Sequence, residues 1–435
     1  MTAPSIAVRG DVASLDARAR RVLFDRSSAS DPRVRTLTNR IVERVRSEGD
    51  TALIAYAREF DHVTLKSLEV PRAAWRTALE ALAPSLRRSF ERSAANIRLV
   101  HEAFRPVARE VVTVDGAVIG RRPDPLARVG VYAPGGRAAY PSSLLMGVIP
   151  ARVAGVGEVI VCTPPGPDGL PSPVLLAAAE LAGVDRLFAV GGAGAVAAMA
   201  YGTATIPAVD RIVGPGNAYV AEAKAQVASV TAIDSPAGPS ELLIIADGSA
   251  SPEVLARELL AQAEHDPVAA VVLVSTSARL LDAVEEHLGE WVPREPRADV
   301  IAAALSSRGA LLLAATLADA VAFSNQWAPE HLVIATTDAD ALLADVRNAG
   351  TVFVGESATV AFGDYMSGAN HVLPTGGLAR AYSGLSTIDF YRWTTWQRIG
   401  PVAAASLADD VATFADAEGL PAHAASARQW LRNAS

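Results

Sequence analysis

Two side chains able to bind a metal lie at the end of one predicted helix. Residues 251–266 read Ser-Pro-Glu-Val-Leu-Ala-Arg-Glu-Leu-Leu-Ala-Gln-Ala-Glu-His-Asp. Ser251 suits the N-cap, proline suits the first helical position, and apolar residues follow at helical spacing. Residues three apart are neighbours on a helix, so Gln262 and His265 could direct an amide oxygen and an imidazole nitrogen at one point. For a lone pair of this spacing a solvated arrangement is commoner, so a metal site needs further ligands.

Three later segments add side chains of the same kinds, and four of the seven histidines of the chain fall in these segments or in the helix above. The side chains in question are Glu330, His331, Asp364, His371, Glu418 and His423. Imidazole, carboxylate and amide oxygen without thiolate suit Zn²⁺, and Mn²⁺ or Co²⁺ could substitute. Glu330 beside His331 offers two groups that can move protons near neutral pH. In the dipeptide alone a solvated pair is favoured, and spacing does not prove that the segments converge.

Three glycine-rich turns follow predicted strands in the first half of the chain: residues 132–137, 191–197 and 214–217. The carboxyl edge of a parallel sheet is where ligands bind, and a helix N-terminus suits phosphate. Gly192-x-Gly194-x-x-Ala197 fits a dinucleotide fingerprint, but the acidic residue expected at the end of the next strand is missing. Helix packing explains that turn at least as well, and Asn217 could simply cap a helix.

The elements that position these residues form two alternating series. Residues from about Ser14 to Glu110 have a helical pattern, and strands separated by helix-length connections begin at Val129. The predicted strands are 129–132, 159–162, 187–190 and 211–213, then 242–246, 271–275, 311–314, 332–335 and 352–354. Such spacing predicts two α/β units with parallel sheets. Pro401–Ser435 reads as two helices broken at Gly419–Pro421, too small for a core of their own, so we expect them to pack elsewhere, for example on a partner subunit.

Composition limits the class of protein. The chain has 435 residues, of which 50% are apolar and 20% charged, as in a soluble globular protein of two to four domains. A net charge of −8 without a basic run argues against nucleic acid and anionic membrane as partners. No signal-peptide core and no stretch of about 18 apolar residues appears. Cys162, the single cysteine, lies in an apolar run that predicts a core role, and its isolation excludes intrachain disulfides. Together these features predict a cytoplasmic protein.

Six motifs resemble those of the histidinol dehydrogenase family in order and spacing, and the resemblance covers nearly the whole chain. They are Gly214-Pro-Gly-Asn217, Asp234-Ser-Pro-Ala-Gly-Pro-Ser240-Glu, Gln262-Ala-Glu-His265-Asp, Ala328-Pro-Glu330-His331-Leu, Gly363-Asp364-Tyr-x-x-Gly-x-Asn370-His371-Val-Leu-Pro-Thr and Glu418-Gly-Leu-x-Ala-His423. The resemblance implies oxidation of L-histidinol to L-histidine through L-histidinal with two NAD⁺.

The resemblance also implies roles for single residues. The zinc ligands would be Gln262, His265, Asp364 and His423. The substrate contacts would be these four together with Ser240, His331, His371 and Glu418. His331 would deprotonate the alcohol, and Glu330 would activate the water that adds to the aldehyde. Since no motif contains cysteine, a hydrate is the plausible adduct before the second hydride transfer.

The family's fold would be an intertwined homodimer of two Rossmann-like α/β domains with small N- and C-terminal pieces and shared active sites. In this chain we expect an N-terminal helical segment at 1–20 and a main domain at 21–131 and 240–385 with the metal and catalytic residues. An NAD-binding domain would occupy 132–239, and a tail at 386–435 would reach the partner subunit. Tyr132 and Asn217 match the family's cofactor contacts, but Gly194 stands where the family usually has glutamine. We therefore predict a weaker NAD⁺ complex than is usual in the family.

Three other functions are compatible with part of this set of residues. The nearest alternative is a related zinc- and NAD-dependent dehydrogenase of another small alcohol, such as a sulfonated diol. Glu418, suited to a cationic substrate, favours histidinol. A metal-dependent hydrolase using Glu330, or a binding protein without activity, fits less well with three glycine turns and an intact proton-transfer pair.

Overall fold

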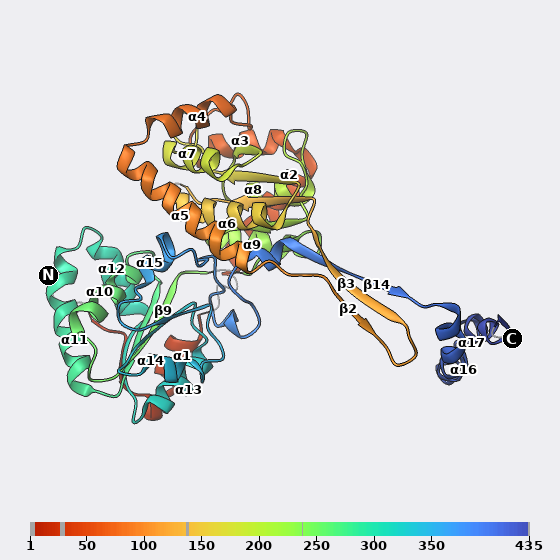
Figure 1. The fold of residues 1–435 in the computed structure, drawn as a ribbon. Coiled ribbons are helices and arrows are strands. Elements are labelled where there is room, and N and C mark those ends of the chain that lie inside the picture. Colours follow the sequence, from red (N-terminus) through yellow and green to blue (C-terminus); the bar gives the residue numbers. More distant parts are fainter. Residues whose placement is uncertain (1–4, 27–30, 136–138, 237, 434–435) are drawn as a thin grey trace. The chain divides into compact units, whose positions relative to one another are not determined.

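The computed structural model describes residues 5–26, 31–135, 139–236 and 238–433 (Figure 1). The chain divides into two compact units. Unit 1 contains Met1–Phe104 and Ala127–Phe390, and unit 2 contains Arg105–Leu126 and Tyr391–Ser435.

Unit 1 contains a six-stranded parallel sheet of order β1-β11-β10-β9-β12-β13. Its strands are β1 (Val8–Asp11), β9 (Glu241–Ala246), β10 (Ala270–Ser275), β11 (Gly309–Leu313), β12 (His331–Ala335) and β13 (Thr351–Val354). The helices of this region are α1 (Ala17–Phe24), α10 (Pro252–Ala263), α11 (Ala278–Trp291), α12 (Ala298–Arg308), α13 (Leu317–Trp327), α14 (Ala339–Leu343) and α15 (Val360–Tyr365). Side chains of a strand alternate between faces, so Leu242 and Leu243 enter different core clusters. Both faces of the sheet are therefore buried.

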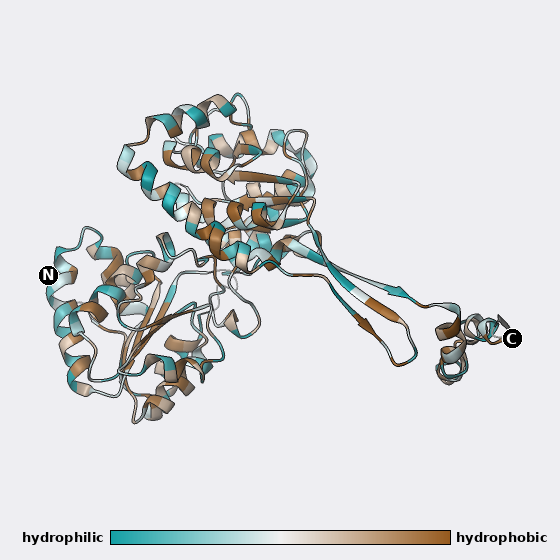
Figure 2. Cartoon of the chain, in the orientation of Figure 1, coloured by the Kyte–Doolittle hydropathy of each residue, from teal (hydrophilic) through white to brown (hydrophobic). Residues whose placement is uncertain are grey.

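A second parallel sheet of unit 1 has five strands in the order β6-β5-β4-β7-β8. They are β4 (Arg128–Tyr132), β5 (Glu158–Thr163), β6 (Arg186–Ala189), β7 (Arg211–Val213) and β8 (Ala232–Ile233). Its connecting helices are α6 (Pro141–Ala154), α7 (Pro173–Ala182), α8 (Gly192–Tyr201) and α9 (Ala218–Val227). Outer helices pack on these: α2 (Pro32–Glu48), α3 (Asp50–Phe60), α4 (Arg72–Ala81) and α5 (Pro84–Ala103). Figure 2 shows hydrophobic colouring along the strands of both parallel sheets, which lie beneath helices.

The two parallel sheets share one topology. Numbered along the chain, β4 to β8 and β9 to β13 both lie in the order 3-2-1-4-5, with β1 added at one edge of the larger sheet. The strand order reverses between β4 and β7, and between β9 and β12, as in doubly wound folds. The similarity lies in topology, since no repeat is visible in the sequence.

Unit 2 is built on an antiparallel sheet of order β14-β3-β2. Its strands are β2 (Arg109–Val112), β3 (Val118–Pro125) and β14 (Tyr391–Arg398), followed by α16 (Pro401–Ala417) and α17 (Pro421–Arg428). The predicted break between two tail helices is confirmed, with Gly419 in the left-handed region at φ 74°. Short 3₁₀ turns complete the chain at Val12–Ser14, Val292–Arg294, Leu378–Arg380, Thr387–Phe390 and Gln429–Asn433. Within the described ranges, no helix is long and apolar enough to cross a membrane.

The parallel α/β class is confirmed, but three expectations about its pieces were wrong. The segment 1–20 is not wholly helical, because Val8–Asp11 adds a strand to the larger sheet. Much of 21–131 belongs with the smaller sheet, since α2, α4 and α5 pack on its helices and Arg128–Tyr132 is one of its strands. The helical pattern predicted to Glu110 ends at Ala103, and a hairpin of β2 and β3 follows. Local periodicity does not tell which sheet a helix will cover.

Candidate active site

Glu330 and His331 lie where the chain enters the larger sheet. Helix α13 ends at Trp327, Ala328 adopts a left-handed conformation at φ 54°, and His331 begins β12. The neighbouring strand β9 begins at Glu241, with Leu242 in register with His331. The predicted acid–base pair therefore lies at the amino end of the two strands that flank the reversal of strand order, and not at their carboxyl end.

The main chain of Glu241 holds both members of this pair. Its N–H donates to Oε2 of Glu330 at 2.7 Å, and its carbonyl oxygen lies 2.9 Å from Nδ1 of His331. Since a carbonyl only accepts, Nδ1 of His331 carries a proton, and in the neutral ring the lone pair is on Nε2. Nε2 is buried and has no hydrogen-bond partner in the described part of the chain. This nitrogen is available to a substrate proton.

Acidic neighbours set the charge of His331. Burial by itself lowers the pKa of the imidazole, but Glu330, with Oε2 3.4 Å from Nδ1, and Asp364 together raise it to about 9. Asp364 Oδ1 lies 3.9 Å from Nε2 of His331. The site thus favours the imidazolium that forms when His331 takes a proton.

The loop after α15 brings a second histidine to the same place. Asp364 Oδ1 lies 3.9 Å from His371 Nδ1, which donates to the Asp364 carbonyl at 2.9 Å. The other ring nitrogen of His371 lies 3.4 Å from the Ser143 hydroxyl of α6. Burial lowers the pKa of His371, so this ring favours the neutral form. The Asn370 amide fixes the loop by donating to the Met146 carbonyl at 2.8 Å.

Gln262 and His265 lie at and beyond the end of α10. The helix ends at Ala263, so the expectation that both residues occupy one helix is wrong: His265 lies two residues beyond its end, and its N–H donates to the Gln262 carbonyl at 3.3 Å. The Gln262 side chain is buried yet makes no hydrogen bond to another described residue. Glu258 of α10 accepts the Val360 N–H of α15 at 2.8 Å, which ties this helix to the helix that carries Asp364.

The remaining predicted site residues are placed as follows. Ser240 directly precedes β9 and is partly buried. Glu418 follows α16 and His423 lies in α17, both in unit 2, whereas the other predicted site residues belong to unit 1. Within the described ranges, no group of three or more His, Cys, Asp or Glu side chains forms a ready-made metal cluster.

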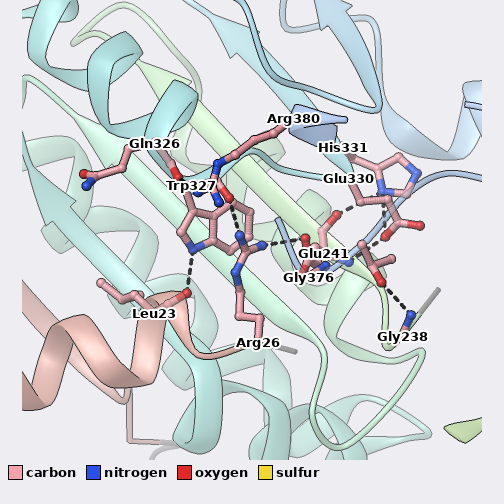
Figure 3. A network of polar contacts seen from close by, with 11 residues as sticks. Leu23, Arg26, Gly238, Glu241, Gln326, Trp327, Glu330, His331, Gly376 and Arg380 are labelled. Atoms are coloured by element: carbon pink, nitrogen blue, oxygen red, sulfur yellow. Dashed lines mark hydrogen bonds and ion pairs between the residues drawn. The ribbon is translucent and has the colours of Figure 1, made fainter. Parts of the chain in front are cut away.

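Two residues that sequence reasoning missed complete the network. The Glu241 carboxylate accepts from Arg26 Nη1 at 2.5 Å and from the Gly376 N–H at 2.8 Å (Figure 3). Burial raises the pKa of Glu241 to about 7 against the pull of Arg26, and burial lowers the pKa of Arg26 to about 10. Glu241 belongs to the motif that includes Ser240, but nothing local indicated Arg26 as its partner.

A separate cavity of about 370 Å³ lies over the carboxyl ends of β4, β5 and β6. Its lining includes Asp61, Tyr132, Gly192, Gly194 and Asn217. The Tyr132 hydroxyl accepts the Gly192 N–H at 3.1 Å, and burial raises the pKa of Tyr132 to about 12. The Asn217 side-chain oxygen caps α9 by accepting the N–H groups of Tyr219 and Val220, at 3.0 and 3.2 Å. Of the three glycine turns, residues 136–138 lie outside the described residues.

Gly194 is closely packed in this cavity. A Cβ on Gly194 would lie 3.3 Å from Leu53 Cδ2 of α3, so a larger residue requires that side chain to shift by a few tenths of an ångström. Cys162 is buried in β5, and burial raises the pKa of its thiol, as its expected core role requires.

Comparisons with known proteins identify the family of the chain. The family model for histidinol dehydrogenase matches residues 24–431. The chain is 46% identical to histidinol dehydrogenase of Methanosarcina barkeri, covering 92% of this chain and 93% of the relative. It is 45% identical to that of Aromatoleum aromaticum with full coverage of both. The crystal structure of histidinol dehydrogenase from Elizabethkingia anophelis matches with a TM-score of 0.93 at 32% identity, covering 99% of each chain. With a whole-length family match and these relatives, the chain belongs to the histidinol dehydrogenase family of NAD-dependent oxidoreductases.

Proposed function

We propose that the chain carries out the last steps of histidine biosynthesis, the oxidation of L-histidinol to L-histidine. In the first step the alcohol loses a proton to the enzyme and a hydride to NAD⁺, which gives L-histidinal. Water then adds to the aldehyde, and the hydrate loses a hydride to a second NAD⁺. The observation that carries the proposal is the buried, unpartnered Nε2 of His331 beside Asp364.

His331 is suited to take the alcohol proton, because Glu241 fixes its Nδ1 as the donor and leaves Nε2 as the base. Glu330 is suited to activate water. Its Oε2 is held by the Glu241 N–H, whereas Oε1 makes no hydrogen bond to a described residue. A cysteine adduct of the aldehyde has no support, because Cys162 is enclosed in β5. A hydrate is therefore the intermediate that these residues favour.

A zinc ion fits the donor set, with Mn²⁺ or Co²⁺ as alternatives. Gln262, His265, Asp364 and His423 would hold it. The Gln262 side chain supports this assignment, because the residue is largely buried and its amide makes no hydrogen bond to a described residue, which leaves its oxygen free for a ligand. When bound, the metal would hold the amine and imidazole of the substrate, and Ser240, His371 and Glu418 would make the other contacts.

The cavity over the smaller sheet is the proposed NAD⁺ site, with Tyr132 and Asn217 as contacts. Backbone N–H groups at the start of α8 and α9 suit a pyrophosphate. Gly194 offers no side-chain amide to the cofactor. This difference underlies the expectation of weak NAD⁺ binding.

We also propose a cytoplasmic homodimer in which unit 2 of one copy completes the site of the other. The described core of α16 and α17 consists of Ala412, Ala415 and Ala424, with Ala427 packed against it. Val402 and Phe414 are 86% and 70% exposed, and β2 exposes Val111 and Val112. A unit with so small a core and so much exposed apolar surface requires a covering partner. Under this arrangement Glu418 and His423 reach the partner's Asp364 region.

The test is turnover by the purified, zinc-loaded protein. L-histidinol and a sulfonated diol are supplied separately with NAD⁺, and products are separated by chromatography. The proposal expects histidine from histidinol and little turnover of the diol. Turnover of the diol alone would establish the related dehydrogenase, histidine without NADH would indicate different chemistry, and bound zinc without turnover would indicate a binding protein.

A further inference from the structure

Arg26 and Glu241 form an ion pair within the core of the larger sheet's domain. Their side chains are 2% and 3% exposed, and Nη1 lies 2.5 Å from Oε2 (Figure 3). Desolvating two charges costs about as much as their attraction returns, so such a pair is weak evidence for a gain in stability. Its contacts indicate another role.

Glu241 contacts three segments of the candidate active site at once. Its peptide N–H binds Glu330, its carbonyl binds His331, and Oε1 accepts the N–H of Gly376 in the loop that follows His371. Displacement of Glu241 would therefore release both members of the acid–base pair and one end of the His371 loop.

Arg26 also holds the end of α13, the segment that leads into Glu330 and His331. Its Nη2 donates to the Trp327 carbonyl, and its guanidinium carbon lies 3.6 Å from the centre of the Trp327 ring. Trp327 ends α13 three residues before Glu330, and the Trp327 indole N–H donates to the Leu23 carbonyl at 2.8 Å. Gly377 packs closely, since a Cβ there would lie 3.3 Å from Nη2. A planar guanidinium can stack and donate in two directions, which an ammonium group cannot do.

We infer that Arg26 and Glu241 are a positioning pair for Glu330 and His331. The inference rests on the proposed function. Neither side chain touches a reacting atom; the pair fixes Trp327 before Glu330 and the peptide of Glu241 beside it. The geometry of proton transfer depends on these two contacts, because a displacement of about 1 Å can cost on the order of 100-fold in rate.

Four variants test the inference: Arg26→Lys, Arg26→Met, Glu241→Gln and the double variant Arg26→Met/Glu241→Gln. Each single neutralisation leaves one buried charge unpaired, so we expect these two variants to lose stability strongly, and kcat is compared only in the double variant and Arg26→Lys. The double variant removes both charges and should fold. We expect its kcat with histidinol to fall roughly 10- to 100-fold. KM for NAD⁺ should stay within about two-fold, because the pair does not line the cofactor cavity.

Arg26→Lys separates geometry from charge. It keeps the positive charge, so a purely electrostatic or structural role predicts full kcat, whereas the positioning role predicts a folded protein with lowered kcat. The control for loss of an ion pair away from the site is Arg128→Met, which breaks the partly exposed 2.5 Å pair of Arg128 and Glu158 in the smaller sheet. It should lower the melting temperature without lowering kcat.

The outcomes are distinct. Lowered kcat in each of these two variants that folds, the double variant and Arg26→Lys, supports the inference. Wild-type kcat in either folded variant overturns it. The inference is also overturned if the substitutions lower only the melting temperature and leave kcat unchanged in every variant that folds. If the unmodified protein does not form histidine from histidinol, the proposed function itself fails, and the variants are then not needed to show it.

Discussion

The carbonyl oxygen of Glu241 lies 2.9 Å from Nδ1 of His331, and this contact decides which ring nitrogen is the base. A backbone carbonyl fixes the tautomer independently of pH over the range in which the ring is neutral. The residue that orients His331 also donates its N–H to Glu330. One peptide unit thus organises both proton-transfer groups.

Glu330→Gln should stop the reaction after the first oxidation. An amide oxygen still accepts the Glu241 N–H, so the fold is preserved, but the side chain no longer takes a proton from water. Loss of a general base costs roughly 10²–10⁴-fold. Trapping of histidinal with a carbonyl reagent, followed by product analysis, measures the effect. Histidine formation at the full rate would remove the role given to Glu330.

His423→Asn should reduce both zinc content and activity. The substitution removes a proposed ligand and changes nothing in unit 1. The loss of zinc affinity should therefore exceed the roughly 10- to 100-fold that follows the loss of a residue that only orients a ligand. Metal analysis after dialysis gives the readout. His287→Asn is the control, since His287 lies on α11 and stacks on Trp291. Equal zinc content in both variants would exclude His423 as a ligand.

Gly194→Gln should lower KM for NAD⁺. Glutamine supplies an amide in the cofactor cavity, at the expense of a small shift of Leu53. Gly194→Ala controls for that shift because it adds the Cβ alone. Initial rates at saturating histidinol measure KM for each variant. An unchanged or raised KM in the glutamine variant, with the alanine variant unaffected, would contradict the explanation of weak binding.

Stability should fall in acid because of His101. This residue of α5 is buried, with Nδ1 3.1 Å from the Thr387 hydroxyl, and burial lowers its pKa to about 4. Since the unfolded chain binds the proton at a pKa of about 6.5, the stabilisation is complete above that value and is lost as the pH falls from 6.5 to 4. The contribution is at most about 3 kcal/mol. Urea unfolding of His101→Gln beside the unmodified chain should show a weaker pH dependence; identical pH profiles would contradict it.

The sequence predicted most of the local structure that positions the site. Most of the parallel strands, the two tail helices and the loop that carries His371 follow from periodicity, glycine placement and side-chain type. Asp364 was expected in that loop, but it lies in the short helix α15, whose six residues carry too little periodicity to be recognised. The short strand Val8–Asp11 was missed because four residues carry little periodicity, and it forms only by pairing with β11. The hairpin of β2 and β3 was missed because its exposed valines lack a buried face.

Partners distant in the chain were the least predictable part of the site. Arg26 and Glu241 are 215 residues apart, and no local pattern encodes their pairing. Glu241 was visible within a motif, directly before the predicted strand 242–246, but nothing indicated that its carboxylate is buried. Arg26 follows α1 without any motif. Only the folded sheet brings the guanidinium of Arg26 to Glu241 and Trp327.

The count of NADH formed per histidinol consumed tests the central claim most directly. With limiting L-histidinol, excess NAD⁺ and zinc-loaded protein, the absorbance of NADH is followed to its end point while histidine is quantified. Two sequential oxidations at one site predict two NADH per histidinol and one histidine. A ratio of one with an aldehyde product, or histidine formed without NADH, would contradict the four-electron reaction assigned to Glu330 and His331.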